Sequence, residues 1–262
     1  MRILLVLFLA LCGPSMAQDP EVDVELFLAV DVSRSMSAEE LEIQRRGYAD
    51  ALTHPEVLAA ISNGMLGRIA VAYVEWAGDY AQREVVPWSL LASAEDAQNI
   101  ATQIMTTQDA GLQRTSISGA LLYAAETFEG NGFQGLRRVI DVSGDGPNNQ
   151  GRPVTRARDS VLARGFIING LPLMTRDALD RIWGIEDLDV YYQNCVISGP
   201  GSFVIPVLEW TKFADAVKRK LILEIADLPS GLHFAEFTTG NDFDCLIGEK
   251  IWERNRRYFE IP

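Results

Sequence analysis

The fold of this chain is decided by the stretch Leu26-Phe27-Leu28-Ala29-Val30-Asp31-Val32-Ser33-Arg34-Ser35-Met36. It begins as an unbroken apolar run, which is typical of a strand buried on both faces in a parallel sheet covered by helices. The run ends in an Asp-x-Ser-x-Ser cluster. Open α/β sheets bind their ligands at the carboxyl edge of the strands, where this cluster falls. A carboxylate and two hydroxyls are oxygen ligands that suit Mg²⁺ first, with Mn²⁺ or Ca²⁺ as alternatives.

Residues 1–17 have the pattern of a signal peptide and are excluded from the fold. Arg2 supplies the positive start, and residues 3–11 form an apolar core too short for a stable membrane-spanning helix. Ser15-Met16-Ala17 is a small-x-small cleavage site. We therefore expect cleavage before Gln18 and a periplasmic or secreted product.

The remaining chain of about 245 residues is long enough for one large α/β domain. The full sequence has a net charge of −13, which becomes −14 when Arg2 is removed with the signal peptide. Such acidity argues against nucleic acid or an anionic membrane surface as a partner, and solubility explains it most simply. No later segment has the length and uninterrupted apolarity of a membrane span.

Two cysteines remain after the signal peptide, Cys195 and Cys245. An even count in an exported chain favours a disulfide between them, with two buried free thiols as the alternative. The only histidines are His54 and His233. The chain therefore has too few cysteines and histidines for a zinc site built from these residues.

Strand and helix patterns alternate from Val24 onward. After the first strand, apolar runs predict strands at residues 68–76, 82–88, 136–142, 166–173, 191–197 and 203–207. Capping signals and helical periodicity predict helices at residues 38–53, 93–105, 116–128, 155–164 and 212–225. The short link after Trp76 makes the next two strands an antiparallel hairpin at one edge. The alternation predicts a doubly wound, mainly parallel sheet flanked by helices, with one antiparallel edge strand.

The chain from about Asp227 has little periodicity. We therefore expect one domain over residues 18–226 and a C-terminal extension over residues 227–262. The extension should pack on the domain, where Cys245 would hold it. No repeat, low-complexity segment or linker indicates a second domain.

Three loops carry oxygen ligands that a doubly wound sheet would bring together. Asp31, Ser33 and Ser35 follow the first strand, Thr115 precedes a predicted helix, and Asp145 follows the strand at residues 136–142. Each has a simpler interpretation by itself. The serines and the threonine are common helix caps, and Asp145-Gly146 is a common turn. Their occurrence in order, each at a strand end or before a helix, favours one shared site.

At these residues the chain resembles the von Willebrand factor A domain with its metal-ion-dependent adhesion site. The matches are the Asp-x-Ser-x-Ser motif, the threonine of the second loop and the Asp-Gly turn after an apolar strand. The resemblance covers about residues 24–225. One departure is Gln113-Arg114, where many such domains place two glycines before the threonine.

A second pattern resembles an uncharacterised family of exported bacterial proteins, the domain of unknown function 1194. It consists of Tyr191-Tyr192-Gln193-Asn194-Cys195 followed by Gly199-Pro200-Gly201-Ser202-Phe203. This resemblance supports export and a disulfide, and it implies no known activity.

The resemblance to the von Willebrand factor A domain implies a role for each residue of the site. Ser33 and Ser35 would bind the metal directly, and Thr115 directly or through water. Asp31 and Asp145 would act largely through bound waters. Neutral hydroxyls leave the charge of the cation under-compensated, and Mg²⁺ demands six oxygens. The vacant position would then attract a carboxylate from a partner protein.

We therefore expect a non-catalytic, exported module of the adhesion type that captures an acidic residue of a partner protein through bound Mg²⁺. The alternative is a Mg²⁺-dependent hydrolase that uses Ser33 or a metal-bound water as nucleophile. Against it, no histidine falls in or near the three loops, and no basic residue is clearly placed as a general base. A fold that binds no metal is disfavoured because every ligand position is filled.

Overall fold

The computed structural model describes residues 19–106, 112–175, 184–226 and 243–256. The predicted signal peptide and its cleavage site therefore lie outside the described residues, as do residues 227–242 of the predicted extension. None of the described helices has the length and apolar character that crossing a bilayer requires.

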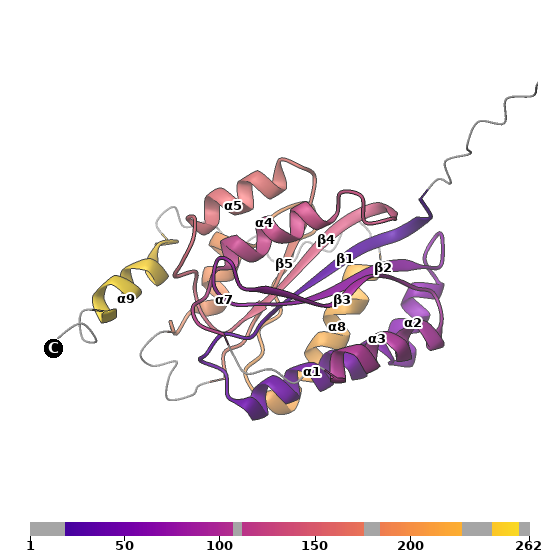
Figure 1. The fold of residues 1–262 in the computed structure, drawn as a ribbon, viewed down its shortest axis with the longest axis horizontal. Coiled ribbons are helices and arrows are strands. Elements are labelled where there is room, and N and C mark those ends of the chain that lie inside the picture. The colour runs from indigo at the N-terminus through magenta and orange to yellow at the C-terminus, as the bar shows by residue number, and fades with distance from the viewer. Residues whose placement is uncertain (1–18, 107–111, 176–183, 227–242, 257–262) are drawn as a thin grey trace, which may run out of the picture.

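The core of the protein is one five-stranded sheet with the strand order β3-β2-β1-β4-β5 (Figure 1). All neighbouring pairs are parallel except the edge pair of β2 and β3, which is antiparallel. The strands are β1 (Glu21–Asp31), β2 (Ile69–Trp76), β3 (Gln82–Leu91), β4 (Gln134–Gly144) and β5 (Ile167–Pro172). The predicted mainly parallel sheet with one antiparallel edge strand is confirmed.

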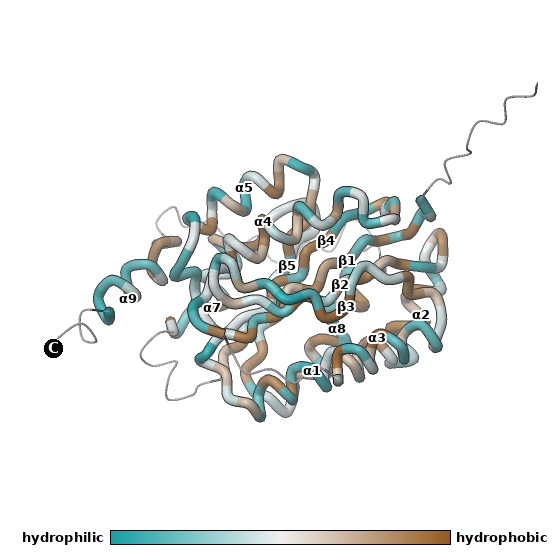
Figure 2. The backbone as a smooth tube through the Cα atoms, viewed as in Figure 1, coloured by the Kyte–Doolittle hydropathy of each residue, from teal (hydrophilic) through white to brown (hydrophobic). Residues whose placement is uncertain are grey.

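Helices cover both faces of the sheet (Figure 1). One layer contains α1 (Ala38–Leu52), α2 (Pro55–Ser62), α3 (Ala94–Thr106) and α8 (Phe213–Ile225). The other contains α4 (Ile117–Thr127), α5 (Val154–Leu162) and the short α7 (Leu188–Tyr191). Each face of the sheet has its own apolar cluster with the helices above it. Figure 2 shows that apolar residues concentrate in the strands and along the helices that pack on them.

The apolar run that predicted the first strand forms the centre of the sheet. Every residue of β1 after Glu21 is buried, because strands lie on both sides and helices above and below. The helix after it begins at a capping box, as its sequence indicates. Ser37 Oγ accepts a hydrogen bond from the Glu40 amide, and Glu40 Oε2 accepts one from the Ser37 amide. These two bonds fix where the chain turns from the sheet edge into α1.

Two of the predicted strands are wrong. Residues 191–197 continue α7 as one π-helical turn, Tyr192–Val196. Aromatic and β-branched residues suggested a strand, but the buried residues recur at helical spacing, at Leu188, Tyr191, Tyr192, Cys195 and Val196. Residues 203–207 make only isolated bridges to β5 and the residue after it. Pro206 has no amide hydrogen to donate to a continuous ladder.

Besides α7, the described helices α2 and α9 were not predicted. The helix α2 begins with Pro55, and His54 Nδ1 caps it by accepting a hydrogen bond from the Glu56 amide. The helix α9 (Ile247–Arg256) lies in the C-terminal extension, which was expected to lack periodicity. It projects beyond the end of the sheet at which β1 and β4 finish (Figure 1).

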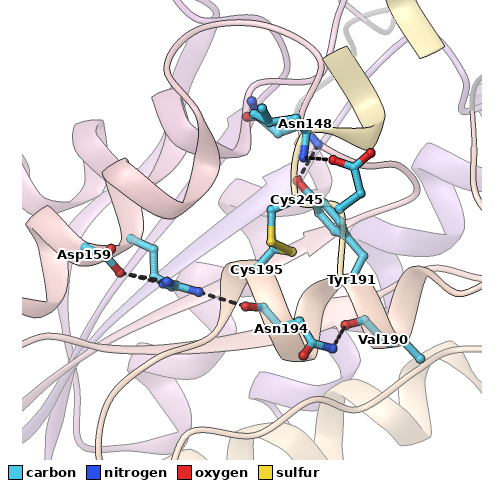
Figure 3. Close-up of a disulfide and its surroundings, with 10 residues drawn as sticks. Asn148, Asp159, Val190, Tyr191, Asn194, Cys195 and Cys245 are labelled. Atoms are coloured by element: carbon cyan, nitrogen blue, oxygen red, sulfur yellow. Dashed lines mark hydrogen bonds and ion pairs between the residues drawn. A yellow bond between two sulfur atoms is a disulfide. The ribbon is translucent and has the colours of Figure 1, made fainter. Parts of the chain in front are cut away.

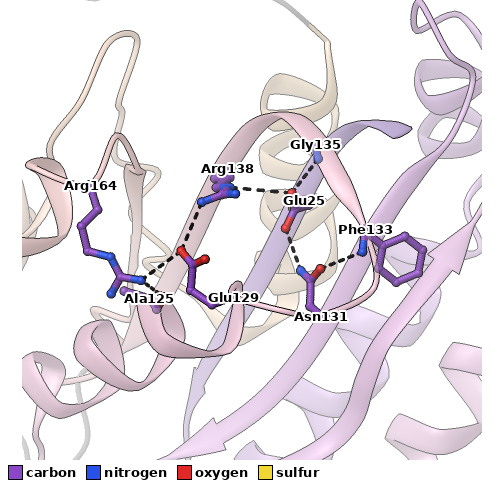
Figure 4. A network of polar contacts seen from close by, with 8 residues as sticks. All are labelled: Glu25, Ala125, Glu129, Asn131, Phe133, Gly135, Arg138 and Arg164. Atoms are coloured by element: carbon purple, nitrogen blue, oxygen red, sulfur yellow. Dashed lines mark hydrogen bonds and ion pairs between the residues drawn. The ribbon is translucent and has the colours of Figure 1, made fainter. Parts of the chain in front are cut away.

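The opposite end of the sheet is closed by a polar network (Figure 4). The Glu25 side chain is fully buried and accepts hydrogen bonds from the Gly135 amide at 2.6 Å and from Asn131 Nδ2 at 2.7 Å. Arg138 lies between Glu25 and Glu129, at 3.8 Å and 3.6 Å from their carboxylate oxygens. Both Glu25 oxygens are therefore satisfied within the fold.

A buried ion cluster joins β4 to α8 beneath the sheet. Lys220 Nζ lies 2.6 Å from Asp141 Oδ1 and also pairs with Glu224, which in turn accepts a hydrogen bond from Asn169. One ammonium group faces two carboxylates. Burial, together with the charge of Asp141, raises the pKa of Glu224 to about 7.

This cluster predicts a pH dependence of stability. Because the pKa of Glu224 rises from 4.5 in the unfolded chain to about 7 in the fold, the folded state holds the proton more tightly. The stabilisation that comes from this tighter binding of the proton is present below pH 4.5 and is lost as the pH rises through about 7. We expect wild type to lose about 2–3 kcal/mol of unfolding free energy over this interval relative to Glu224→Gln. Urea denaturation of both proteins at the two ends of the interval measures it. Parallel pH profiles would contradict the assignment.

Candidate metal site at the carboxyl edge of the sheet

The first part of the site is the turn that follows β1. Asp31 is fully buried, and its Oδ1 accepts a hydrogen bond from the Ser33 amide at 2.7 Å. This bond is the local Asp turn that the sequence favours. It brings Ser33 Oγ to 3.0 Å from Ser35 Oγ. The Asp31 carbonyl accepts a hydrogen bond from Gln44 Nε2 of α1, which fixes the turn against the helix layer.

The loop after β4 supplies Asp145. Ser33 Oγ donates a hydrogen bond to Asp145 Oδ1 at 3.4 Å, although the two residues are 112 positions apart. Ser35 joins the same group through its contact with Ser33 Oγ. The parallel pairing of β1 with β4 brings the two strand ends together, as the sheet topology requires. Four of the five predicted ligand residues therefore form one cluster.

Thr115 is linked to this cluster through the backbone. Its amide donates to Asn149 Oδ1 at 3.0 Å, and its carbonyl accepts from the Asn149 amide at 2.9 Å. The nearby Leu112 amide donates to the Val32 carbonyl at 2.8 Å. The Thr115 loop is thus fastened to both of the other loops, and Thr115 itself is buried.

The two carboxyl groups of the cluster both have raised pKa values. Burial raises the pKa of Asp31 well above its ordinary value, and the charge of Asp145 raises it further. Burial also raises the pKa of Asp145, against hydrogen bonds from Ser35 and Ser33 that lower it. A buried carboxylate beside a half-buried one is costly to ionise without a cation.

One oxygen of Asp31 has no hydrogen-bond partner in the described part of the fold. Asp31 Oδ2 and the Tyr192 hydroxyl are buried and make no hydrogen bond among the described residues. A Cβ added at Gly144 would lie 2.9 Å from each of these two oxygens, so both face the same small space. A buried carboxylate oxygen without a donor calls for water or a cation. With three hydroxyls and two carboxylates, the residues present fit a hard divalent cation.

Sequence reasoning missed the residues that support the site. Tyr192 falls in a segment predicted as a strand, and Asn148 and Asn149 are not among the predicted site residues. Asn148 is fully buried, and its Oδ1 accepts a hydrogen bond from the Ser118 amide at 3.0 Å. Its backbone amide donates to the Tyr191 hydroxyl at 3.1 Å. Two adjacent asparagines soon after a predicted strand were the available signal. Among the described residues, no cluster of three or more histidine, cysteine, aspartate or glutamate side chains is arranged to hold a metal.

The C-terminal helix is joined to the rest of the fold by a disulfide and by a contact with Asn148 (Figure 3). Cys195, in the π-helical turn, is bonded to Cys245, as predicted. Asn148 Nδ2 donates to Glu249 Oε1 of α9 at 2.8 Å. A Cβ added at Gly248 would come within 2.0 Å of the Asn148 carbonyl oxygen, so only glycine permits this close approach. The described part of the extension therefore contacts the Asp145 loop directly.

Arg114 stands where many such domains have glycine. Its φ of 75° lies in the left-handed region, which costs a non-glycine residue roughly 1–2 kcal/mol. The guanidinium carbon lies 3.2 Å from the centre of the Trp252 ring of α9. This cation–π contact offsets part of the backbone cost.

A family model described as "Protein of unknown function (DUF1194)" matches residues 21–229. A search of curated proteins found no match to the sequence. Solved structures with a similar fold share little sequence identity with this chain. They include proximal thread matrix protein 1 from the mussel byssus, with a TM-score of 0.58 and 14% identity over 80% of this chain and 49% of that chain. Another structure of the same byssus protein has a zinc-occupied metal-ion-dependent adhesion site motif, with a TM-score of 0.54 and 15% identity over 80% and 49% of the two chains.

Two further structures come from bacteria. The pilus adhesin SpaC from Lactobacillus rhamnosus GG has a TM-score of 0.54 and 13% identity over 79% of this chain and 31% of that chain. A von Willebrand factor type A structure from Catenulispora acidiphila has a TM-score of 0.53 and 14% identity over 78% and 43%. The chain spans about half, or less, of the length of these structures. The likeness confirms the von Willebrand factor A-like fold.

Proposed function

From the premise that the chain belongs to the DUF1194 family and has a von Willebrand factor A-like fold, we propose that it is an exported, non-catalytic module that binds a partner protein through a metal ion. Mg²⁺ is the expected ion, with Mn²⁺ or Ca²⁺ as alternatives. When bound, the ion supplies a positive charge with an open coordination position for a carboxylate of the partner. The proposal places the product in the periplasm or outside the cell, and the bond between Cys195 and Cys245 is compatible with that location.

The observation that carries the proposal is the unpartnered Asp31 Oδ2, buried next to a cluster of hydroxyls. Ser33 and Ser35 would hold the ion directly through their hydroxyls, which lie 3.0 Å apart, and the Ser33 hydroxyl also approaches Asp145. Thr115 would bind directly or through water. Asp31 and Asp145 would act largely through waters, with Asp31 held in place by the Ser33 amide.

The net negative charge of the chain favours a binding site that supplies its own local positive charge. A protein with a net charge of −13 repels an acidic partner at long range. Attraction of a carboxylate to this edge must therefore come from a local positive charge. The proposal predicts binding that depends strictly on the divalent ion.

The hydrolase alternative gains no support from the site. His54 serves as the N-cap of α2, and its Nδ1 accepts the Glu56 amide hydrogen. His233 lies outside the described residues. Within the described residues, the ionisable groups beside Ser33 are the carboxylates Asp31 and Asp145, whose raised pKa values burial explains.

Partner capture tests the proposal. We expect immobilised wild-type protein to retain proteins from a periplasmic extract in Mg²⁺ and to release them on addition of a chelator. Ser33→Ala should weaken the metal site less than loss of Asp31 and still impair capture, because one direct ligand is removed. Ser62→Ala, which removes an exposed hydroxyl on α2, is the control and should capture normally. Mass spectrometry of the eluates identifies what is bound. Retention of the same proteins by Ser33→Ala and in the presence of chelator would contradict the proposal.

A further inference from the structure

A cationic surface lies beside the three loops that carry the predicted metal ligands, and none of its residues is a predicted ligand. It consists of Arg114, Trp252 and Arg256, and we refer to it as the arginine surface. Arg114 immediately precedes Thr115, and its guanidinium group stacks on the Trp252 ring. Trp252 and Arg256 are four residues apart on α9 and therefore share one face of that helix. Burial and the charge of Arg256 both lower the pKa of Arg114, so the two guanidinium groups are close enough to repel each other.

Several arginines of the described chain are neutralised by carboxylates, whereas these two form no ion pair among the described residues. Arg45, Arg138 and Arg164 each form an ion pair with a carboxylate. Across the four described segments, neither Arg114 nor Arg256 has such a pair. The sequence contains 36 acidic residues against 23 basic ones, so carboxylates are plentiful. Two adjacent arginines with no counter-ion in the described part of the chain are suited to bind an external anion.

Contacts on two sides hold the arginine surface in place relative to the loops that carry the predicted metal ligands. The disulfide to Cys195 holds the chain just before α9, and Glu249 accepts a hydrogen bond from Asn148 in the loop that carries Asp145. Arg114 is attached directly to the Thr115 loop. A ligand that reaches the ion would therefore meet the arginine surface a short distance further along the same edge.

Stacking on Trp252 also determines how Arg114 can bind. The guanidinium carbon lies over the ring, and within the described segments the N–H groups of Arg114 form no ion pair with a carboxylate. A carboxylate accepts two parallel hydrogen bonds from the edge of a guanidinium group, and this pairing is among the stronger charge-assisted hydrogen bonds. The arrangement fits a carboxylate better than it fits a neutral amide.

We propose that the arginine surface binds a second carboxylate on the same partner protein whose first carboxylate binds the metal. The recognised feature is then an acidic segment with at least two acidic side chains. This inference rests on the proposed function, because the metal anchors the first carboxylate. It assigns Arg114 and Arg256 as residues that determine specificity.

Two fluorescein-labelled peptides test the inference with the full mature protein. One is hexaglutamate, and the other has a single glutamate among five glutamines. In Mg²⁺, we expect wild type to bind hexaglutamate about 10-fold more tightly than the single-glutamate peptide by fluorescence polarisation. Arg114→Gln and Arg256→Gln should each reduce this preference several-fold while leaving the Mg²⁺ affinity and the single-glutamate affinity unchanged.

Arg254→Gln is the matched control, because it removes the same charge from the same helix at an exposed position away from the Trp252 face. It should keep the full preference for hexaglutamate. Circular dichroism establishes that each variant is folded. Equal Mg²⁺-dependent affinity of wild type for both peptides, or an equal effect of all three substitutions, would overturn the inference and leave the proposed function in place. Failure of wild type to bind either peptide in a Mg²⁺-dependent way would instead overturn the proposed function, and the inference with it.

Discussion

We expect Asp31→Ala to abolish measurable Mg²⁺ binding, with a loss of affinity of at least roughly 100-fold, while the protein stays folded. The Asp31 carboxylate orients Ser33 through its amide and has a second oxygen free for the ion or its water. Its removal takes away both contributions. Burial disfavours the ionised form of Asp31 in the metal-free protein, so the fold loses little when the group is removed.

Calorimetric titration with Mg²⁺ and Mn²⁺ measures this effect. The matched control is Asp23→Ala, at the opposite end of the same strand. Asp23 is also a buried carboxylate, and it accepts hydrogen bonds from the Leu66 and Arg68 amides. Its loss should lower stability and leave Mg²⁺ affinity unchanged. Equal metal affinity in folded wild type and Asp31→Ala would mean that Asp31 does not hold the ion.

The second large effect concerns the disulfide. Replacing both Cys195 and Cys245 with alanine should lower the unfolding free energy by about 4 kcal/mol, the loop-closure value for a separation of 50 residues. Alanine leaves no unpaired hydroxyl in the buried position of Cys195. Guanidinium denaturation of wild type and the double variant gives the difference.

A dithiol reductant supplies the control for this experiment. Dithiothreitol should lower the unfolding free energy of wild type to about that of the double variant. It should leave the unfolding free energy of the double variant unchanged. Mass spectrometry under non-reducing conditions should show the native mature protein two hydrogens lighter than its reduced form. Two freely alkylated thiols in native protein, or identical denaturation curves, would contradict the account of the disulfide.

The parts of the fold that follow from local patterns could be predicted from the sequence. The apolar run before Asp31 is long enough to indicate a central strand, and Ser37 with Glu40 gives a capping box that the structure confirms. The five residues between Trp76 and Gln82 are too few for a crossover helix, so the hairpin between β2 and β3 follows. These signals depend on neighbours in the sequence and not on distant contacts.

The segment around Tyr192 was misassigned because composition and tertiary packing favour different structures. Adjacent tyrosines and valines have high strand propensity. In the fold, Tyr191 and Tyr192 pack into the core as one side of a helix, and the Asn148 amide donates to the Tyr191 hydroxyl. Only the packed structure reveals that preference. It also places the Tyr192 hydroxyl beside Asp31, which the sequence order does not indicate.

The contacts that support the site could not be predicted from the sequence, for a similar reason. Thr115 meets Asn149, and Arg114 meets Trp252, through contacts between distant parts of the chain. Such contacts leave no periodic pattern in one sequence. The five predicted ligand residues could be named because each lies at a strand end or before a helix, positions that local patterns do mark.

The metal site itself is tested most directly by diffraction from crystals of the mature protein soaked in Mn²⁺, with data collected at the manganese absorption edge. The account predicts one strong anomalous peak about 2.1–2.2 Å from the hydroxyl oxygens of Ser33 and Ser35, and its absence from Asp31→Ala crystals. An anomalous peak elsewhere on the protein, or none in wild-type crystals soaked at millimolar Mn²⁺, would contradict it.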